Sequence, residues 1–216
     1  MTQTQTATSV NQSFLDVLQS RRSVRHYDPS FVISQEEIQE ILELATKSPS
    51  SSNTQSWRFL VVTDPELKKQ LQPIANNQQQ VADASALIIL LGDLEMYNKV
   101  EKINQLAVDA GYMPEDFAKQ FTENSIKLYT SLPRERLHEV AVFDSGLVAM
   151  QIMLIAKSKG YDTVPMGGYN RIQLKQFFNL PDHLEPTIIL PIGKAATEGR
   201  QTARLPIADV TFWNHI

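Results

Sequence analysis

The feature that most constrains this chain is a run of apolar residues between positions 140 and 156. The run lies inside a predicted helix that begins after Pro133 and ends at Gly160, residue types that are common at the two ends of a helix. Apolar side chains occur nearly all round this helix, and a helix without a polar face has to be covered on every side. In a chain of 216 residues, the pattern favours a second subunit as one of the covering walls.

The composition is ordinary for a globular domain and argues against several classes of protein. The net charge is -4, whereas nucleic-acid binders usually carry a basic face. The absence of cysteine excludes disulfides, thiolate nucleophiles and zinc–thiolate sites. We find no apolar run of membrane-spanning length and no apolar signal core in residues 1–12, which are expected to be a flexible tail. A cytoplasmic protein that binds neither nucleic acid nor membrane is the simplest inference.

Residues 13–216 are expected to form a single domain of helices and strands. Helices are predicted over residues 14–18 and 35–47, after Asp64, and after Asn170. Strands are predicted over residues 57–62, 86–91 and 187–193. Residues 95–132 are polar and weakly periodic, which indicates one or two inserted helices. Such an insertion would serve as a lid or a partner-covering arm, with surface decoration as the alternative.

Residues 21–25 read Arg-Arg-Ser-Val-Arg and place three guanidiniums and a hydroxyl just behind the first helix. Cations this close repel one another unless an anion lies between them. Since a guanidinium keeps its charge and donates parallel hydrogen bonds, phosphate is its natural partner. Taken alone, a solvated basic helix end is an equally good interpretation.

Three further stretches carry groups that fit a polar heterocycle. Residues 48–53 are a hydroxyl-rich loop, residues 76–80 are a run of amides, and residues 165–168 end in paired glycines. Amides donate and accept hydrogen bonds, and glycines let backbone N–H groups approach a ligand closely. Each stretch also has a plain interpretation, as a connection, a solvated surface or a tight turn. The four histidines lie far apart, so no metal site is expected, and no Gly-x-Gly-x-x-Gly or Walker-type loop is present.

Four motifs, taken in order, resemble the nitroreductase family of FMN-dependent oxidoreductases. They are Arg-Arg-Ser-Val-Arg, Ser-Pro-Ser-Ser-Ser-Asn-Thr-Gln-Ser-Trp, Pro-Met-Gly-Gly-Tyr and Arg-Leu-Pro, and the resemblance covers nearly the whole chain. It implies an α+β fold, with a central, mostly antiparallel sheet wrapped by helices. It also implies an intertwined homodimer with one FMN in each of two pockets at the subunit interface. The apolar helix matches what the core of such a dimer requires.

The resemblance assigns cofactor-binding residues by position. The residues that match the phosphate and ribityl contacts are Arg21, Arg22, Ser23, Arg204 and, more loosely, Arg200. The loop that the other subunit would contribute holds Pro49, Ser50, Ser51 and Asn53. The stretch placed against the isoalloxazine is Pro165, Met166, Gly167 and Gly168, with a backbone N–H of Gly167 or its neighbour near flavin N5. The pyrimidine edge would be met by Arg25, Asn77 and Gln80, the last standing where some relatives have a lysine.

The implied activity is hydride transfer from NADH or NADPH to flavin N5, followed by reduction of a nitroaromatic, a quinone or a similar small acceptor at the same face. Sharing of one face implies ping-pong kinetics. Arg25 would stabilise the negative charge that develops on reduced flavin, so no acid–base side chain is required in the first half-reaction. Two alternatives stay open at this point, since fold does not fix function. One is a flavin enzyme with another substrate, such as a reductive dehalogenase, and the other is a non-catalytic flavin-binding sensor.

Overall fold

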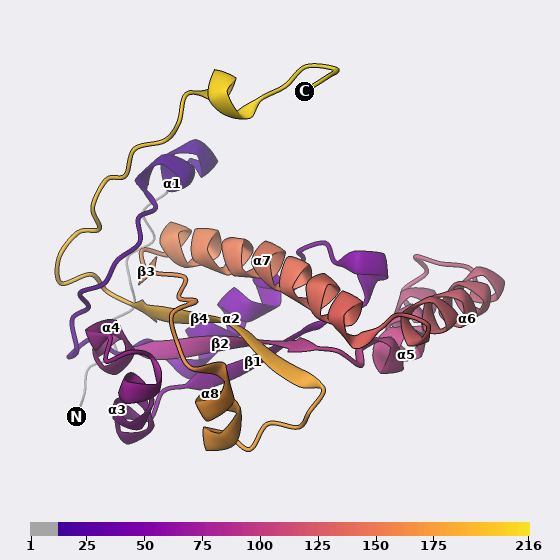
Figure 1. The fold of residues 1–216 in the computed structure, drawn as a ribbon, viewed down its shortest axis with the longest axis horizontal. Helices are drawn as coiled ribbons and strands as arrows, with labels where there is room; N and C mark the ends of the chain where they lie inside the picture. The colour runs from indigo at the N-terminus through magenta and orange to yellow at the C-terminus, as the bar shows by residue number, and fades with distance from the viewer. Residues whose placement is uncertain (1–12) are drawn as a thin grey trace.

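The computed structural model describes residues 13–216, so the tail predicted over residues 1–12 lies outside the described part. Its centre is a sheet of four strands in the order β1-β2-β4-β3, in which every neighbouring pair is antiparallel. The strands are β1 (Trp57–Val62), β2 (Ala86–Asp93), β3 (Asp162–Thr163) and β4 (Leu184–Gly193). Helices cover both faces of this sheet, so the predicted α+β class with an antiparallel sheet is confirmed (Figure 1).

Helices form where the sequence predicts them, and the short helix α4 is one that it does not predict. They are α1 (Phe14–Ser20), α2 (Gln35–Ala45), α3 (Pro65–Ile74), α4 (Gln79–Asp83), α5 (Val100–Asp109), α6 (Glu115–Thr130), α7 (Arg134–Ser158) and α8 (Arg171–Phe177). The side chains of Ser34, Asp64 and Asn170 each accept a hydrogen bond from a backbone N–H in the first turn of the helix that follows. These caps explain why α2, α3 and α8 start where the sequence predicts.

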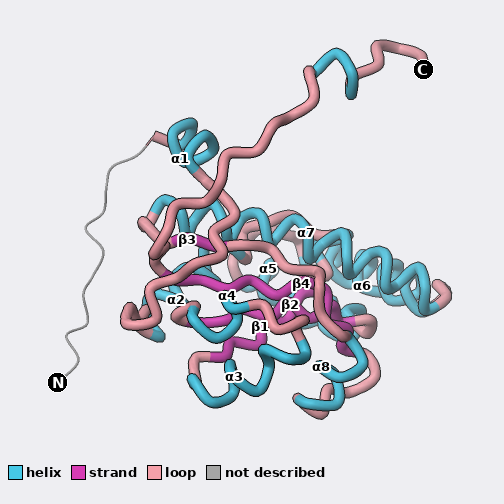
Figure 2. Tube along the Cα trace, turned by 60° about the vertical axis from the view of Figure 1, so that its left-hand side comes forward, coloured by secondary structure: helices cyan, strands magenta, loops and turns pink. Residues whose placement is uncertain are grey.

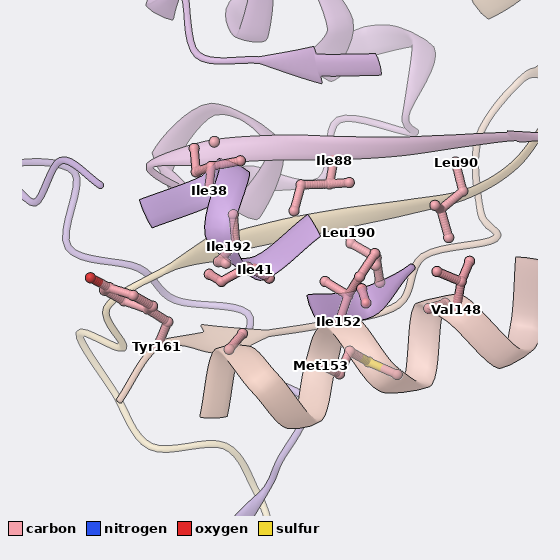
Figure 3. Close-up of a cluster of buried hydrophobic side chains, with 14 of the residues drawn as sticks. Ile38, Ile41, Ile88, Leu90, Val148, Ile152, Met153, Tyr161, Leu190 and Ile192 are labelled. Carbon is pink, nitrogen blue, oxygen red and sulfur yellow. The ribbon is translucent and has the colours of Figure 1, made fainter. Parts of the chain in front are cut away.

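The apolar strand β2 supplies two cores at once. Its residues are buried along the whole strand, and successive side chains point to opposite faces of the sheet. Ile88 and Leu90 pack with α2 and α7 on one face, as Figure 3 shows. Leu87 and Ile89 pack against residues of α3, α4 and α8 on the other face. Each fully buried leucine or isoleucine contributes about 1.5–3 kcal/mol to the free energy of unfolding.

Helix α7 covers the sheet with one side and leaves apolar side chains on the other. Val148 and Ile152 are fully buried against the sheet, and Gly160, with φ +78°, ends the segment as predicted. Phe143 on the same helix is 63% exposed. By length and composition α7 could cross a membrane, although the sequence was expected to hold no run of that length. In the fold, α7 packs as a core helix. An apolar groove of about 690 Å³ runs along its exposed side, between α1 and Pro49.

Two segments stand away from the sheet. The inserted residues form a short 3-10 turn (Met96–Lys99) and then α5 and α6, which extend beyond the sheet as a helical pair (Figure 1). The chain after β4 runs as an extended arm past α1 and carries the short turn Ile207–Val210 (Figure 2). The arm is exposed over most of its length, including Trp213, which is 83% exposed.

Candidate functional site

The arginine stretch lies along the edge of the sheet. The N–H of Val24 donates to the carbonyl of Thr163 in β3 at 3.2 Å, and Ser23 and Thr163 form a parallel bridge. The glycine loop of residues 165–168 leaves β3 directly, and Met166 pairs with Ile189 of β4 through two backbone hydrogen bonds of 2.9 and 3.0 Å. The β3 edge therefore brings together the Arg-Arg-Ser-Val-Arg and Pro-Met-Gly-Gly motifs, which are about 140 residues apart in the sequence.

The C-terminal arm crosses the arginine stretch at close range. The N–H of Ala196 donates to the carbonyl of His26 at 2.8 Å. At Gly199 an added Cβ would lie 2.5 Å from the Cβ of Arg22 and 3.1 Å from the carbonyl oxygen of Ser23. Only a glycine fits such an approach. Sequence reasoning missed Gly199, although it stands immediately before Arg200.

Positively charged side chains lie close together where the arm crosses the arginine stretch. Burial lowers the pKa of Arg21, and the positive charges of Arg204 and then Arg22 lower it further. Within residues 13–216, no ion pair with a carboxylate involves these three arginines. Such a cluster of guanidiniums beside the hydroxyl of Ser23 has the donors that a phosphate monoester needs.

Amides from the turn between α3 and α4 hold the glycine loop. The carbonyl of Gly168 accepts hydrogen bonds from Asn76 Nδ2 at 3.0 Å and from Gln78 Nε2 at 2.9 Å. The sequence singled out Asn77 and Gln80 instead. Gln80 is buried, and its Nε2 donates to Gln78 Oε1 at 2.9 Å, so it lies behind the loop. Asn77 is exposed and contacts neither glycine in any hydrogen bond of the described residues. The left-handed backbone of Asn76 and Asn77 sets this arrangement, and a run of amides does not reveal it.

The structure also corrects the expectation for Met166. Its side chain is 5% exposed and belongs to the core below the sheet, and both its backbone groups are paired with Ile189. Met166 therefore anchors the loop rather than offering a free group to a ligand. Pro165, Gly167 and Gly168 are exposed, and in the described chain the N–H groups of the two glycines make no hydrogen bond.

The hydroxyl-rich loop is organised from helix α7. Asp144 is fully buried, and its Oδ1 accepts from both the N–H and the Oγ of Ser51 at 2.9 Å. Its Oδ2 accepts from Ser56 Oγ at 2.8 Å. The apolar pattern of residues 140–156 does not by itself single out Asp144. The available signal was a single carboxylate inside the apolar run, since a buried charge has to be hydrogen-bonded.

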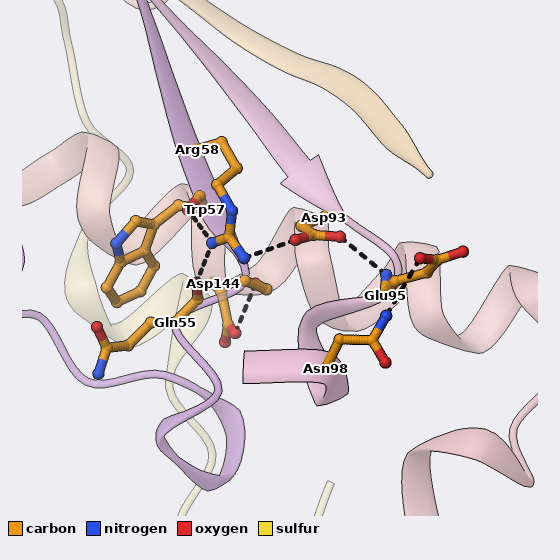
Figure 4. A network of polar contacts seen from close by, with 8 residues as sticks. Gln55, Trp57, Arg58, Asp93, Glu95, Asn98 and Asp144 are labelled. Atoms are coloured by element: carbon orange, nitrogen blue, oxygen red, sulfur yellow. Dashed lines mark hydrogen bonds and ion pairs between the residues drawn. The ribbon is translucent and has the colours of Figure 1, made fainter. Parts of the chain in front are cut away.

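The same loop is held in an unfavourable backbone conformation. Ser52, Asn53 and Gln55 all have positive φ, at 48°, 53° and 48°. Such residues cost on the order of 1 kcal/mol or more each, and persist only where surrounding contacts fix them. Tyr129 of α6 donates to Ser52 Oγ at 3.0 Å. Arg58 donates to the Gln55 carbonyl at 2.8 Å and is itself held by Asp93 at 2.6 Å, as Figure 4 shows.

Comparison with known proteins decides the family. The sequence profile described as "Nitroreductase family" matches residues 18–194. The chain belongs to the nitroreductase family. Similar curated proteins include "Putative NAD(P)H nitroreductase YdgI" of Bacillus subtilis, 43% identical over 202 residues, or 93% of this chain and 97% of that one. The "CLA biosynthesis enone reductase" of Lactiplantibacillus plantarum is 31% identical over 198 residues, or 90% of this chain and 91% of that one.

Solved structures agree with the family. A "putative nitroreductase in complex with FMN" from Exiguobacterium sibiricum is 42% identical, with a TM-score of 0.91, and covers 98% of this chain and all of that one. A "putative NAD(P)H:FMN oxidoreductase" from Staphylococcus epidermidis is 38% identical, with a TM-score of 0.94, over 98% of this chain and 100% of that one.

One chain of this nitroreductase contains two separate groups of site residues. The arginines, the arm and the glycine loop meet at the β3 edge, whereas the hydroxyl-rich loop bonds to β1, α6 and α7. Among the described residues, no hydrogen bond joins this loop to Arg21, Arg204 or the glycine loop. The expected role of Pro49, Ser50, Ser51 and Asn53 in a pocket shared with a second subunit stays a prediction.

Proposed function

We propose that this protein is an FMN-dependent oxidoreductase that takes electrons from NADH or NADPH and passes them to small organic acceptors. The observation that carries the proposal is the β3 edge, where the Arg-Arg-Ser-Val-Arg stretch pairs with Thr163 and the glycine loop of residues 165–168 leaves the same strand. This combination fits a phosphate joined to a flat polar heterocycle. The relatives named NAD(P)H nitroreductase and NAD(P)H:FMN oxidoreductase support the same chemistry.

In this proposal, different residues at the β3 edge bind different parts of the cofactor. Arg21, Arg22, Ser23 and Arg204 bind the phosphate and ribityl chain, with Arg200 entering from the same arm. The N–H groups of Gly167 and Gly168, which are not used in the described chain, would be the donors to the flavin ring. Arg25 is an exposed cation that would stabilise negative charge on the pyrimidine edge of a reduced flavin. Bound FMN supplies the two-electron carrier that accepts hydride from the nicotinamide.

A second copy of the chain completes the pocket in this proposal. The exposed apolar side of α7 and the groove beside α1 have the character of a surface buried between subunits. The hydroxyl-rich loop then reaches the flavin of the other subunit with Pro49, Ser50, Ser51 and Asn53. Two chains related by a two-fold axis give two equal pockets.

The acceptor is expected to be a nitroaromatic, a quinone or a conjugated enone, and to occupy the face that the nicotinamide leaves. The relative named as an enone reductase is the reason to include enones. Since donor and acceptor share one face, initial-rate plots at several fixed acceptor concentrations should give the parallel lines of a ping-pong mechanism. The inserted pair α5 and α6 is proposed as the wall that selects among acceptors.

The deciding experiment is an anaerobic titration of the purified yellow protein with NADH and then with NADPH. Bleaching of the flavin absorption bands within seconds, followed by recovery when a quinone, a nitroaromatic or an enone is added, is the expected result. Flavin bands that persist with both nicotinamides would favour the sensor or the dehalogenase-like enzyme. A protein that takes up no FMN would refute the proposal as a whole.

A further inference from the structure

Asp144 is a buried carboxylate for which the proposed reaction has no use. It lies on α7 among apolar neighbours and is fully buried, and no ion pair within residues 13–216 involves it. A buried charge without a cation persists only when hydrogen bonds replace its lost water. Asp144 has three such bonds, and all three donors belong to Ser51 and Ser56.

These two serines stand at the two ends of a strained segment. Between them lie Ser52, Asn53 and Gln55, whose backbone is left-handed. Because the carboxylate binds one serine with each oxygen, it fixes the distance between the ends of the loop. The N–H of Gln55 also donates to Ser50 Oγ at 3.0 Å, which closes the loop on itself. The loop conformation is thus imposed by contacts from α7 rather than by the preferences of its own residues.

A second contact connects the loop to the inserted helices. Tyr129 is buried at the end of α6, and its hydroxyl lies 3.0 Å from Ser52 Oγ. The segment proposed to select acceptors and the loop proposed to contact flavin are therefore joined through Ser52. Displacement of the loop would therefore change both the position of the inserted helices and the proposed contact with flavin.

We propose that Asp144 is a positioning residue that holds the loop between Ser51 and Ser56 in the conformation that receives the flavin. The inference rests on the proposed function and deepens it, because the loop has no ligand to position if no flavin binds. Within residues 13–216, the hydrogen bonds of the Asp144 carboxylate all come from Ser51 and Ser56. Its effect on the cofactor passes through the position of Ser50, Ser51 and Asn53.

The test compares FMN dissociation constants, obtained by titrating flavin-free dimers and following the quenching of flavin fluorescence. Asp144→Asn is expected to weaken FMN binding about tenfold or more, because it loses hydrogen bonds to a charged acceptor. A double variant, Ser51→Ala with Ser56→Ala, leaves the carboxylate in place and removes both hydroxyl donors. This double variant is also expected to weaken FMN binding. It replaces Asp144→Asn in the test if that variant does not fold.

Two controls separate positioning from a general loss of stability. Ser145→Ala removes a fully buried hydroxyl on the neighbouring residue of the same helix, one that has no hydrogen-bond partner within residues 13–216, and it should leave FMN binding unchanged. Thr187→Val removes a buried hydroxyl that donates to the Leu90 carbonyl at 3.0 Å in the sheet, away from the loop. It should lower the Tm of the flavin-free protein while FMN binding stays at the parent level.

The outcomes are distinguishable. The positioning role alone is overturned if the parent protein binds FMN and both Asp144→Asn and the double serine variant bind it as tightly. The same holds if Thr187→Val weakens FMN binding as much as Asp144→Asn does at a comparable loss of Tm. Parent protein that takes up no FMN overturns the proposed function and this inference together.

Discussion

Gly199 lies directly against Arg22, so that a Cβ on the glycine would come within 2.5 Å of the Arg22 Cβ. The contact fixes the point at which the C-terminal arm leaves the body of the protein. Arg200 and Arg204 follow this contact on the arm. The path of the arm that carries the proposed phosphate-binding arginines therefore depends on a residue that has no side chain.

Gly199→Ala should weaken FMN binding by forcing the arm away from the arginine stretch. The new methyl group meets Arg22 and the Ser23 backbone, and relief of such overpacking costs about 1–3 kcal/mol. The measurement is the FMN dissociation constant, and the expected change is a several-fold increase with little change in the Tm of the flavin-free protein. Thr197→Ala, at an exposed position two residues earlier, is the matched control. Equal FMN affinity in both variants would show that the arm tolerates displacement.

Arg21→Ala and Arg204→Ala should each weaken FMN retention about 10- to 100-fold, the usual value of a hydrogen-bonded charge pair. The physical reason is that, in the proposed pocket, both guanidiniums bind the same phosphate. Retention can be followed as flavin lost from the protein during dialysis. Arg136→Ala removes an equal charge from an exposed ion pair with Glu139 and should retain flavin like the parent. The phosphate assignment is wrong if both site variants hold flavin as tightly as the parent.

Arg25→Gln should lower the two-electron reduction potential of the bound flavin. A cation near the pyrimidine edge favours the reduced, negatively charged form, and a loss of about 1 kcal/mol corresponds to roughly 20 mV for two electrons. Equilibration with a reference dye of known potential gives the value. Arg25→Lys keeps the charge and should stay near the parent potential. An unchanged potential in Arg25→Gln would place this guanidinium away from the flavin.

Local features of this fold were predictable from the sequence, and long-range pairings were not. The caps Ser34, Asp64 and Asn170 bond to residues three positions away, so the sequence contains both partners of each bond. Glu37, three residues after the Ser34 cap, does not return a hydrogen bond to the cap; its carboxylate accepts from the hydroxyl of Tyr161, which is 124 residues away. No local pattern indicates such a partner.

The same limit explains which site residues were missed. Asp144 and Ser51 are 93 residues apart, and Gln78 and Gly168 are 90 residues apart. Each pair forms only because the sheet order β1-β2-β4-β3 brings their elements together. The arginine motif and the paired glycines were found because their residue types carry chemistry wherever the fold places them. Supporting residues such as Gly199 and Asp144 acquire meaning only from their neighbours.

The last prediction concerns which subunit supplies each part of the pocket. If the hydroxyl-rich loop serves the flavin of the other subunit, an Arg21→Ala chain and an Asp144→Asn chain should complement each other. Their mixed dimer has one pocket with both changes and one with neither, so random exchange of subunits makes about a quarter of all pockets intact. The measurement is the fraction of tight FMN sites before and after exchange.

A chain that carries both substitutions provides the opposite arrangement. Mixed with parent chains, it forms mixed dimers in which each pocket has one change, so these dimers should contain no tight site if the loop acts across the interface. If instead the loop serves its own subunit, the opposite results are expected. Mixing the two single variants then gives no tight FMN sites, and mixing the doubly substituted chain with parent chains gives one tight site in each mixed dimer. Because the two arrangements predict opposite patterns from the same four chains, the experiment distinguishes a shared pocket from one built within a single subunit.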